Sequence, residues 1–244
     1  DKVIRLPLVK KLDSRDELIQ FVSPAITDPV ACLPCALLSG TTEAIDQWNW
    51  DIMGRLPGEP VAFYSVDTVV ESGSATKVEI PPEALAEMSD VGTPPHKLLL
   101  KEGAVVILMR NLNFDAALCN STKGIVRGFS PSKKIVYVEV QRSGCESGAS
   151  SIHGIPRITF RFSPDGKGME VSRRQFPLRL AYAMTFNKSQ GQTLRRVGAD
   201  LTADVFAHGQ LYVVLSRVRH RDSIRVLTRP ERLQGQSVYA YNLV

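Results

Sequence analysis

The sequence predicts an α/β domain whose chain is interrupted by an inserted β module. Two segments, residues 31–53 and 178–228, alternate buried strands with amphipathic helices, which is the pattern of an α/β sheet. Residues 96–162 instead contain short β-rich runs separated by turn residues, as in a small barrel or curled sheet. We therefore expect residues 1–91 and 173–244 to form the α/β domain, with a small β-barrel inserted at 92–172.

The first α/β elements begin near the N-terminus. Residues 14–17, SRDE, form a capping box before an apolar run, which predicts a short amphipathic helix. Residues 31–40, ACLPCALLSG, predict a buried strand that ends in a turn. Thr41 caps a second predicted helix, in which Trp48 falls on the apolar face and Trp50 on the exposed face.

The middle and the C-terminal part follow different patterns. Between 60 and 90 the sequence predicts a loop-rich connection with a short helix at 82–88, and 142–155 predicts an exposed hairpin loop. Beyond Pro177 the α/β pattern resumes. In order, it predicts a strand (LRLAYAMT), a turn that enters a helix (NKSQGQTL), a strand (RVGADL), a helix (AHGQLYVVLSRV) and a closing strand (SIRVLT).

Charge and cysteine content narrow the classes of function. Within a chain of net charge +5, residues 157–232 hold 15 Lys or Arg and 6 Asp or Glu, so a polyanion is expected there unless this is an ordinary solvated surface. Cys32 and Cys35 have the spacing of a zinc or redox pair. No second CxxC or paired His accompanies them, so we expect buried thiols in a reducing compartment. No apolar run is long enough for a membrane span, and we expect no membrane partner.

One stretch has the chemistry of a phosphate-binding turn. Residues 183–193, AMTFNKSQGQT, combine a Lys-Ser pair with Gln-Gly-Gln-Thr but lack the GxxxxGK[ST] spacing of a nucleotide-binding loop. A strand-to-helix turn would direct free backbone N–H groups and the side chains of Thr185, Asn187, Lys188 and Ser189 toward a phosphate. The alternative is an ordinary turn capped by one of its own hydroxyl groups.

Two segments resemble motifs of one family. Residues 176–193, FPLRLAYAMTFNKSQGQT, and 205–219, VFAHGQLYVVLSRVR, resemble the fifth and sixth motifs of superfamily-one DNA helicases of the PIF (petite integration frequency) type, especially the form carried by Helitron transposons. Parts of 94–120 resemble the inserted barrel of the same proteins. The resemblance spans about residues 36–228.

The resemblance implies a second RecA-like motor domain with an inserted barrel of Src-homology-three type. In this family two RecA-like domains enclose ATP and single-stranded DNA runs across both. The resemblance assigns ATP binding to Gln190, Gly191 and Arg217, with Arg217 as the catalytic arginine finger. The alternative for Arg217 is a surface side chain near a helix end. Binding of single-stranded DNA is assigned to Thr185, Asn187, Lys188, Ser189 and His208.

The resemblance also implies parts that the chain lacks. No GxxxxGK[ST] loop occurs, and the Asp-Glu pair of the Mg²⁺ site, which belongs to the first motor domain in this family, is also absent. We expect an N-terminal RecA-like motor domain to precede Asp1 and to be the partner that mainly holds the Mg²⁺ ion, so that these 244 residues alone do not hydrolyse ATP. The implied function is ATP-dependent unwinding of DNA, 5′ to 3′, at junctions of single-stranded and duplex DNA. The implied location is the nucleus or another DNA-containing compartment such as the mitochondrion.

Two alternatives to a motor remain open. The first is a module that binds single-stranded nucleic acid through the basic region without any motor role. The second is a degenerate transposon remnant that merely folds, although both resembling motifs are intact.

Overall fold

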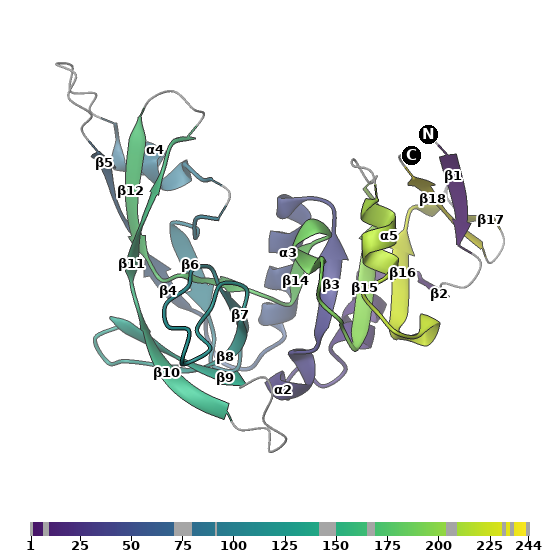
Figure 1. The fold of residues 1–244 in the computed structure, drawn as a ribbon, viewed down its shortest axis with the longest axis horizontal. Coiled ribbons are helices and arrows are strands. Elements are labelled where there is room, and N and C mark those ends of the chain that lie inside the picture. Colours follow the sequence, from purple (N-terminus) through teal and green to yellow (C-terminus); the bar gives the residue numbers. More distant parts are fainter. Residues whose placement is uncertain are drawn as a thin grey trace. The chain divides into compact units, whose positions relative to one another are not determined.

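The computed structural model divides the chain into two compact units (Figure 1). Unit 1 comprises Asp1–Pro57 and Ala181–Val244, and unit 2 comprises Gly58–Leu180. Both ends of the chain thus contribute to unit 1, and its middle forms unit 2. The structure describes residues 2–6, 10–70, 80–90, 92–141, 150–164, 169–203, 209–230, 233–234 and 237–242.

A five-stranded parallel sheet forms the centre of unit 1 (Figure 1). Its strands lie in the order β14 (Ala183–Thr185), β3 (Cys35–Ser39), β15 (Arg196–Leu201), β16 (Ile224–Thr228) and β2 (Lys10–Leu12), and each neighbouring pair is parallel. Every residue of β3 is buried, which is typical of a parallel strand covered on both faces. A small antiparallel sheet consists of β1 (Lys2–Leu6), β18 (Ser237–Asn242) and β17 (Leu233–Gln234).

The helices of unit 1 are α1 (Arg15–Val22), α2 (Pro29–Cys32), α3 (Thr42–Gly54) and α5 (Gln210–Leu215), with the 3-10 turns η2 (Asn187–Ser189) and η3 (Arg221–Ser223). Two of these helices, α1 and α3, begin at the N-caps that the sequence predicts. Ser14 Oγ accepts a hydrogen bond from Glu17 N at 3.2 Å, and Thr41 Oγ1 accepts one from Ala44 N at 3.3 Å. Both predicted N-caps are confirmed. The predicted strand at 31–40 begins only at Cys35, because its first residues belong to α2.

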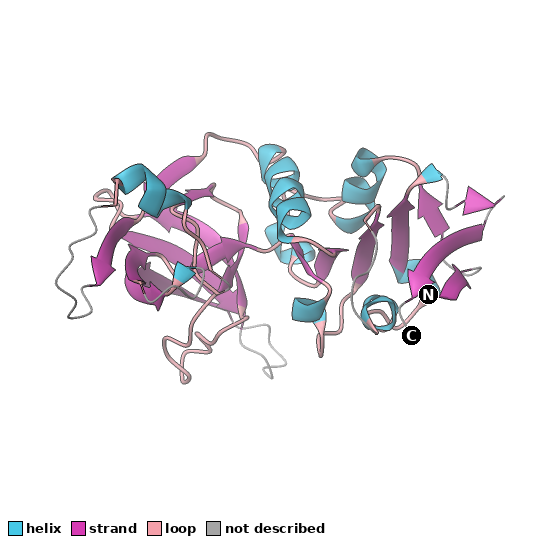
Figure 2. Cartoon of the chain, turned by 90° about the horizontal axis from the view of Figure 1, so that it is seen from above, coloured by secondary structure: helices cyan, strands magenta, loops and turns pink. Residues whose placement is uncertain are grey.

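Helices cover both faces of the parallel sheet (Figure 2). On one face α1 packs so closely on β15 that a Cβ atom at Gly198 would lie 2.7 Å from Val22 Cγ2. On the other face Leu211 and Val214 of α5 join the core formed by alternate residues of β3, β14, β15 and β16. Trp48 of α3 is fully buried, as the sequence predicts. Among the described residues, no helix is both long and apolar enough to cross a membrane.

Antiparallel sheets make up unit 2. One has the order β10 (Ser150–Pro156), β9 (Ile135–Gln141), β8 (Lys123–Phe129), β7 (Val105–Leu108) and β13 (Leu178–Leu180). A second has the order β11 (Ile158–Phe162), β12 (Glu170–Gln175) and β5 (Val66–Val70), and a third pairs β4 (Val61–Tyr64) with β6 (Lys97–Leu100). The single helix described in this unit, α4 (Pro82–Glu87), matches the helix predicted at 82–88.

The unit boundaries differ from the boundaries expected at 91/92 and 172/173. The segment expected to be loop-rich contains β4 and β5, which pair with β6 and β12, so residues 58–91 belong to unit 2. β13 pairs with β7, so the chain leaves unit 2 only after Leu180. Residues 150–155, expected to be loop, form most of β10, whereas 142–149 lie outside the described residues.

A buried ion pair connects elements of unit 2. Arg173 on β12 is 1% exposed, and its Nε and Nη2 donate to Asp67 Oδ1 and Oδ2 at 3.0 and 2.8 Å. Its Nη2 also donates to the carbonyl of Leu85 at 3.0 Å, which holds α4 against the sheet. Burial raises the pKa of Asp67, but hydrogen bonds from Arg173 and Ser65, with the charge of Arg173, outweigh it. The pKa of Asp67 therefore lies below its usual value.

Candidate nucleotide and nucleic-acid interface

The candidate site lies at the carboxyl edge of the parallel sheet in unit 1. β3 ends at Ser39, β14 at Thr185 and β15 at Leu201, and these strands run in the same direction. Ligands of open α/β sheets bind outside the carboxyl ends of the strands. The turn η2 follows β14 at this edge and contains residues of the predicted phosphate-binding stretch.

The segment after β14 is one 3-10 turn, and the helix expected there is absent. Thr185 Oγ1 accepts a hydrogen bond from Lys188 N at 3.3 Å, and Gln190 N donates to the Asn187 carbonyl at 3.2 Å. Residues 192–195 then reach β15 without helical structure. The prediction of a strand-to-helix turn is wrong, and with it the contribution expected from a positive helix end. Any phosphate here would meet side chains and the N–H groups of a short turn.

The side chains of this turn divide into exposed and buried groups. Asn187, Lys188 and Gln190 are exposed, and Thr185 is half-buried. Ser189 is fully buried, and its Oγ donates to the Phe186 carbonyl at 2.6 Å. The expectation that Ser189 faces outward is therefore wrong, because its hydroxyl closes the turn from inside. His208 lies outside the described residues.

Gly191 has a backbone conformation that side chains disfavour. Its φ angle is +79°, and no atom lies within 4 Å of the position a Cβ would take. Glycine is required here by the left-handed backbone and not by crowding. The open space around it leaves the backbone accessible to a ligand group.

Arg217 connects the turn at residues 186–192, in the segment that resembles the fifth motif, to helix α5, in the segment that resembles the sixth. It lies two residues beyond the end of α5 and is half-buried. Its Nη1 donates to the carbonyls of Ser189 and Gln192, both at 3.1 Å, and its Nε donates to the Val213 carbonyl at 2.8 Å. Its own carbonyl accepts a hydrogen bond from Leu194 N at 2.8 Å. This guanidinium is therefore held against its own chain and is not a freely exposed surface group.

Two polar residues that the sequence patterns did not single out support this edge. Asp200, 3% exposed on β15, accepts hydrogen bonds from Trp48 Nε1 at 2.8 Å and Thr202 Oγ1 at 2.6 Å. Asn49 donates to the Ala183 carbonyl and accepts from its N–H, which fastens α3 to β14. Each of these residues is a carboxylate or an amide within an otherwise apolar sequence pattern. A buried polar group of this kind usually has a hydrogen-bond partner, and that signal could have identified both residues.

The basic region at 157–232 is divided between the two units. Residues 157–180 belong to unit 2 and the remainder to unit 1. Arg173 is buried against Asp67, and Arg157 lies over the ring of Phe176, with its guanidinium carbon 4.7 Å from the ring centroid. Burial, followed by the charge of Arg174, lowers the pKa of Arg157. Arg173 and Arg157, which contribute to the excess positive charge, therefore take part in packing inside unit 2.

Comparisons with known proteins agree on one family. Residues 84–129 match the family model "DNA helicase Pif1, 2B domain". The human ATP-dependent DNA helicase PIF1 is 36% identical over 173 residues, which cover 71% of this chain and 24% of the human protein. The crystal structure of Pif1 helicase from Candida albicans aligns with a TM-score of 0.61 and 26% identity, covering 88% of this chain and 50% of that one.

A further solved structure shares the fold. The crystal structure of Bacteroides Pif1 bound to ssDNA aligns with a TM-score of 0.54 at 24% identity, covering 78% of this chain and 40% of that one. The present chain spans about a quarter of the length of the curated relatives it matches. Family model, sequence and fold together show that this chain belongs to the Pif1 DNA helicase family.

Proposed function

We propose that the chain supplies the second motor domain of an ATP-dependent DNA helicase. In this proposal unit 1 is the RecA-like domain and unit 2 is an inserted barrel of Src-homology-three type. The parallel sheet with helices on both faces supports the first assignment, and the 2B-domain match within unit 2 supports the second. The activity in the relatives' names belongs to proteins about three times as long as this chain, so unwinding is proposed here for a longer assembly.

The observation that carries the proposal is the contact between Arg217 and the fifth-motif turn. The guanidinium binds the carbonyls of Ser189 and Gln192, so the residues assigned to ATP and to DNA meet at one strand edge. A motor domain needs such a link because nucleotide state and grip on DNA must change together. Arg217 also has the permanent charge and planar fork that suit a γ-phosphate.

The residues present fit a nucleotide at one side of this turn. Gly191 offers open backbone, Gln190 is exposed, and Arg217 donates to the carbonyls of the two residues that flank them. ATP with Mg²⁺ supplies the phosphoryl group whose hydrolysis drives the motor, with Mg²⁺ held mainly by the N-terminal RecA-like domain. The role of this chain is to place the cationic Arg217 and backbone N–H donors close to the phosphates of the nucleotide.

Single-stranded DNA is proposed to lie along the exposed side of the same turn. Asn187 and Lys188 are exposed there, and Thr185 is half-buried beside them. His208 stays in the proposed set, whereas Ser189 is reassigned to holding the turn. The proposed partners are single-stranded DNA and its junctions with duplex, with movement from 5′ to 3′, in the nucleus or another DNA-containing compartment.

Hydrolysis with and without the N-terminal motor domain tests the proposal. The 244 residues alone should show no turnover, and the same chain joined to an upstream GxxxxGK[ST]-bearing domain should hydrolyse ATP when single-stranded DNA is added. DNA binding by the joined protein without any DNA-stimulated hydrolysis would favour the non-motor binding module. Turnover by the isolated chain, free of contaminating helicase, would contradict the two-domain site.

A further inference from the structure

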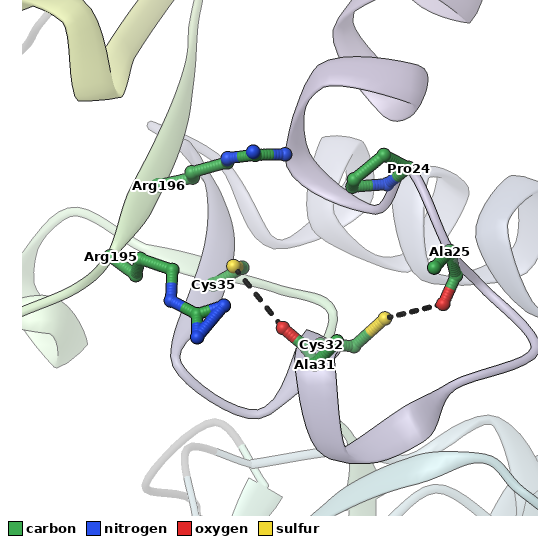
Figure 3. Close-up of a pocket in the computed structure, with 7 residues that line it drawn as sticks. All are labelled: Pro24, Ala25, Ala31, Cys32, Cys35, Arg195 and Arg196. Carbon is green, nitrogen blue, oxygen red and sulfur yellow. Dashed lines mark hydrogen bonds between the residues drawn. The ribbon is translucent and has the colours of Figure 1, made fainter.

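Two cysteines share a small cavity in unit 1 that the proposed motor function does not use (Figure 3). Cys32 ends α2 and Cys35 begins β3, and each is 4% exposed. The cavity has a volume of about 70 Å³ and is lined by Pro24, Ala25, Ala31, Cys32, Cys35, Arg195 and Arg196. A buried pair of thiols at one cavity is a candidate site for paired thiol chemistry.

Both sulfur atoms are held by weak interactions. Cys32 Sγ donates to the Ala25 carbonyl at 3.8 Å, and Cys35 Sγ donates to the Ala31 carbonyl at 3.6 Å (Figure 3). Thiols are weak donors, so small rotations about the Cα–Cβ bonds cost little. No disulfide joins the two sulfur atoms in the structure.

The chain between the two cysteines allows a bridge. Leu33 and Pro34 form the turn between α2 and β3. The ends of a four-residue turn lie within about 7 Å of each other, which overlaps the Cα separation of about 4.4–6.8 Å that disulfides span. A metal is the competing use of such a pair, but structural zinc needs four ligands. Within the described part of the chain, no group of three or more His, Cys, Asp or Glu could hold a metal ion.

The surroundings favour a small oxidant. Arg195 and Arg196 bring positive charge to the cavity, and nearby cations favour the thiolate that acts as the nucleophile. A cavity of about 70 Å³ has room for a molecule of about the size of water or hydrogen peroxide.

We propose that Cys32 and Cys35 form a peroxide-responsive dithiol that closes to an intramolecular disulfide. One thiolate attacks a peroxide oxygen and the O–O bond breaks, which yields a sulfenic acid and a hydroxide ion. A proton then converts the hydroxide to water. The second thiol then attacks the sulfenic sulfur, forming the S–S bond and releasing a second water. The two thiols lose two electrons in total, and hydrogen peroxide is reduced to two waters. In a reducing compartment such a disulfide is transient, as is typical of redox sensors.

The dithiol lies beside the backbone that leads to the candidate site. The carbonyl of Pro34, between the two cysteines, accepts a hydrogen bond from Arg195 N at 2.7 Å. The adjacent Leu194 N donates to the carbonyl of Arg217 at 2.8 Å. A disulfide between Cys32 and Cys35 would therefore constrain the turn on which this segment rests.

Mass spectrometry of the full 244-residue chain tests the proposal independently of any helicase activity. After brief treatment with hydrogen peroxide, the denatured protein is blocked with N-ethylmaleimide and digested with trypsin. The peptide spanning residues 16–55 contains both cysteines and no other. We expect this peptide to lose two hydrogens, to take up no N-ethylmaleimide and to regain both reactive thiols after dithiothreitol.

Single variants separate the paired reaction from general oxidation. In Cys32→Ser and Cys35→Ser the remaining cysteine should stop at the sulfenic acid, which dimedone captures. Cys119→Ser should form the Cys32–Cys35 disulfide as the parent does, because Cys119 is in unit 2. The proposal is overturned if residues 16–55 still bind two N-ethylmaleimide groups when Cys119 is oxidised, or if both cysteines oxidise separately to sulfinic acid. Even if a variant fails to fold, the mass of the 16–55 peptide from the unsubstituted chain shows whether the Cys32–Cys35 disulfide forms.

Discussion

Arg217 Nη1 donates a hydrogen bond to the carbonyl oxygen of Ser189 at 3.1 Å, which links two segments that are 28 residues apart in sequence. Ser189 in turn is fully buried and closes its turn through the Phe186 carbonyl. The two motifs are therefore one structural unit before any ligand binds. An arginine in this position stabilises the turn as well as serving the proposed chemistry.

Arg217→Ala should destabilise unit 1. The substitution leaves the carbonyls of Ser189 and Gln192 without this donor, and hydrogen bonds to charged groups contribute about 1.5–3 kcal/mol each in protected sites. Because Arg217 is only half-buried, we expect a loss of about 1–3 kcal/mol in total. Both tryptophans lie on α3, so tryptophan fluorescence in urea reports the unfolding of unit 1.

Arg219→Ala is the matched control for that measurement. Arg219 is exposed and also follows α5, and its removal should change the free energy of unfolding by less than about 0.5 kcal/mol. Equal effects of the two substitutions would show that the carbonyl contacts of Arg217 do not stabilise the turn.

Gly191→Ala should destabilise unit 1 through the backbone alone. A side chain at φ +79° costs about 1–2 kcal/mol, and no neighbouring atom adds a clash. Gly54→Ala is the control, since Gly54 ends α3 with ordinary φ and equally open surroundings. That change should be neutral or stabilising by up to about 1 kcal/mol. If both variants unfold at the same urea concentration as the parent, the turn does not hold its left-handed conformation in solution.

Lys188→Ala should weaken binding of single-stranded DNA and flatten its salt dependence. Loss of one phosphate contact reduces the slope of log K against log salt by about 0.7 for single strands. Lys10→Ala removes the same charge from the opposite, amino-terminal edge of the parallel sheet and should leave the slope unchanged. Fluorescence anisotropy with labelled single-stranded DNA, at several salt concentrations, measures both. Equal slopes for Lys188→Ala and the parent would remove Lys188 from the DNA contacts.

Asp67 should make the stability of unit 2 dependent on pH. Its pKa is lowered in the folded state, so it stabilises the fold fully above the unfolded carboxyl value of about 3.9. This contribution is lost as the pH falls through the lowered pKa. Asp67→Asn leaves Arg173 buried without its counter-charge, which should cost about 3–5 kcal/mol near pH 7 and much less in acid.

Far-UV circular dichroism in urea at pH 7, 5 and 3 follows this effect in unit 2. Asp222→Asn is the control, because Asp222 pairs with Lys10 at 3.6 Å in an exposed position. This substitution should change the free energy of unfolding by less than about 1 kcal/mol. A cost for Asp67→Asn that stays constant down to pH 3 would contradict the assigned ion pair.

The sequence predicts those elements whose signals are local. The Ser14 and Thr41 caps and the apolar face containing Trp48 specify α1 and α3 within a few residues each. Strands such as β7, Val105–Leu108, consist only of apolar residues and are equally accessible to prediction. Each of these elements contains its own periodicity or cap, so no distant contact is needed to infer it.

The missed features depend on contacts between distant residues. β5 and β10 carry polar residues, Gly or Pro, so their strand character comes from pairing with β12 and β9. The helix expected after β14 does not form because Leu194 N bonds to the Arg217 carbonyl instead of continuing a helix. The role of Asp200 requires Trp48, which lies 152 positions away in the chain.

The most direct test is hydrolysis of ATP by the chain joined to a GxxxxGK[ST]-bearing motor domain at its N-terminus, with Arg217→Ala compared to Arg219→Ala. An arginine finger contributes about 10³–10⁵-fold to turnover, so Arg217→Ala should reduce DNA-stimulated hydrolysis by at least about 10³-fold. Arg217→Lys should remain strongly impaired, because an ammonium lacks the planar fork, while Arg219→Ala should hydrolyse ATP at the parent rate. DNA-stimulated hydrolysis by a folded Arg217→Ala protein within about tenfold of the parent rate would contradict the assignment of this edge as the nucleotide-sensing part of a motor.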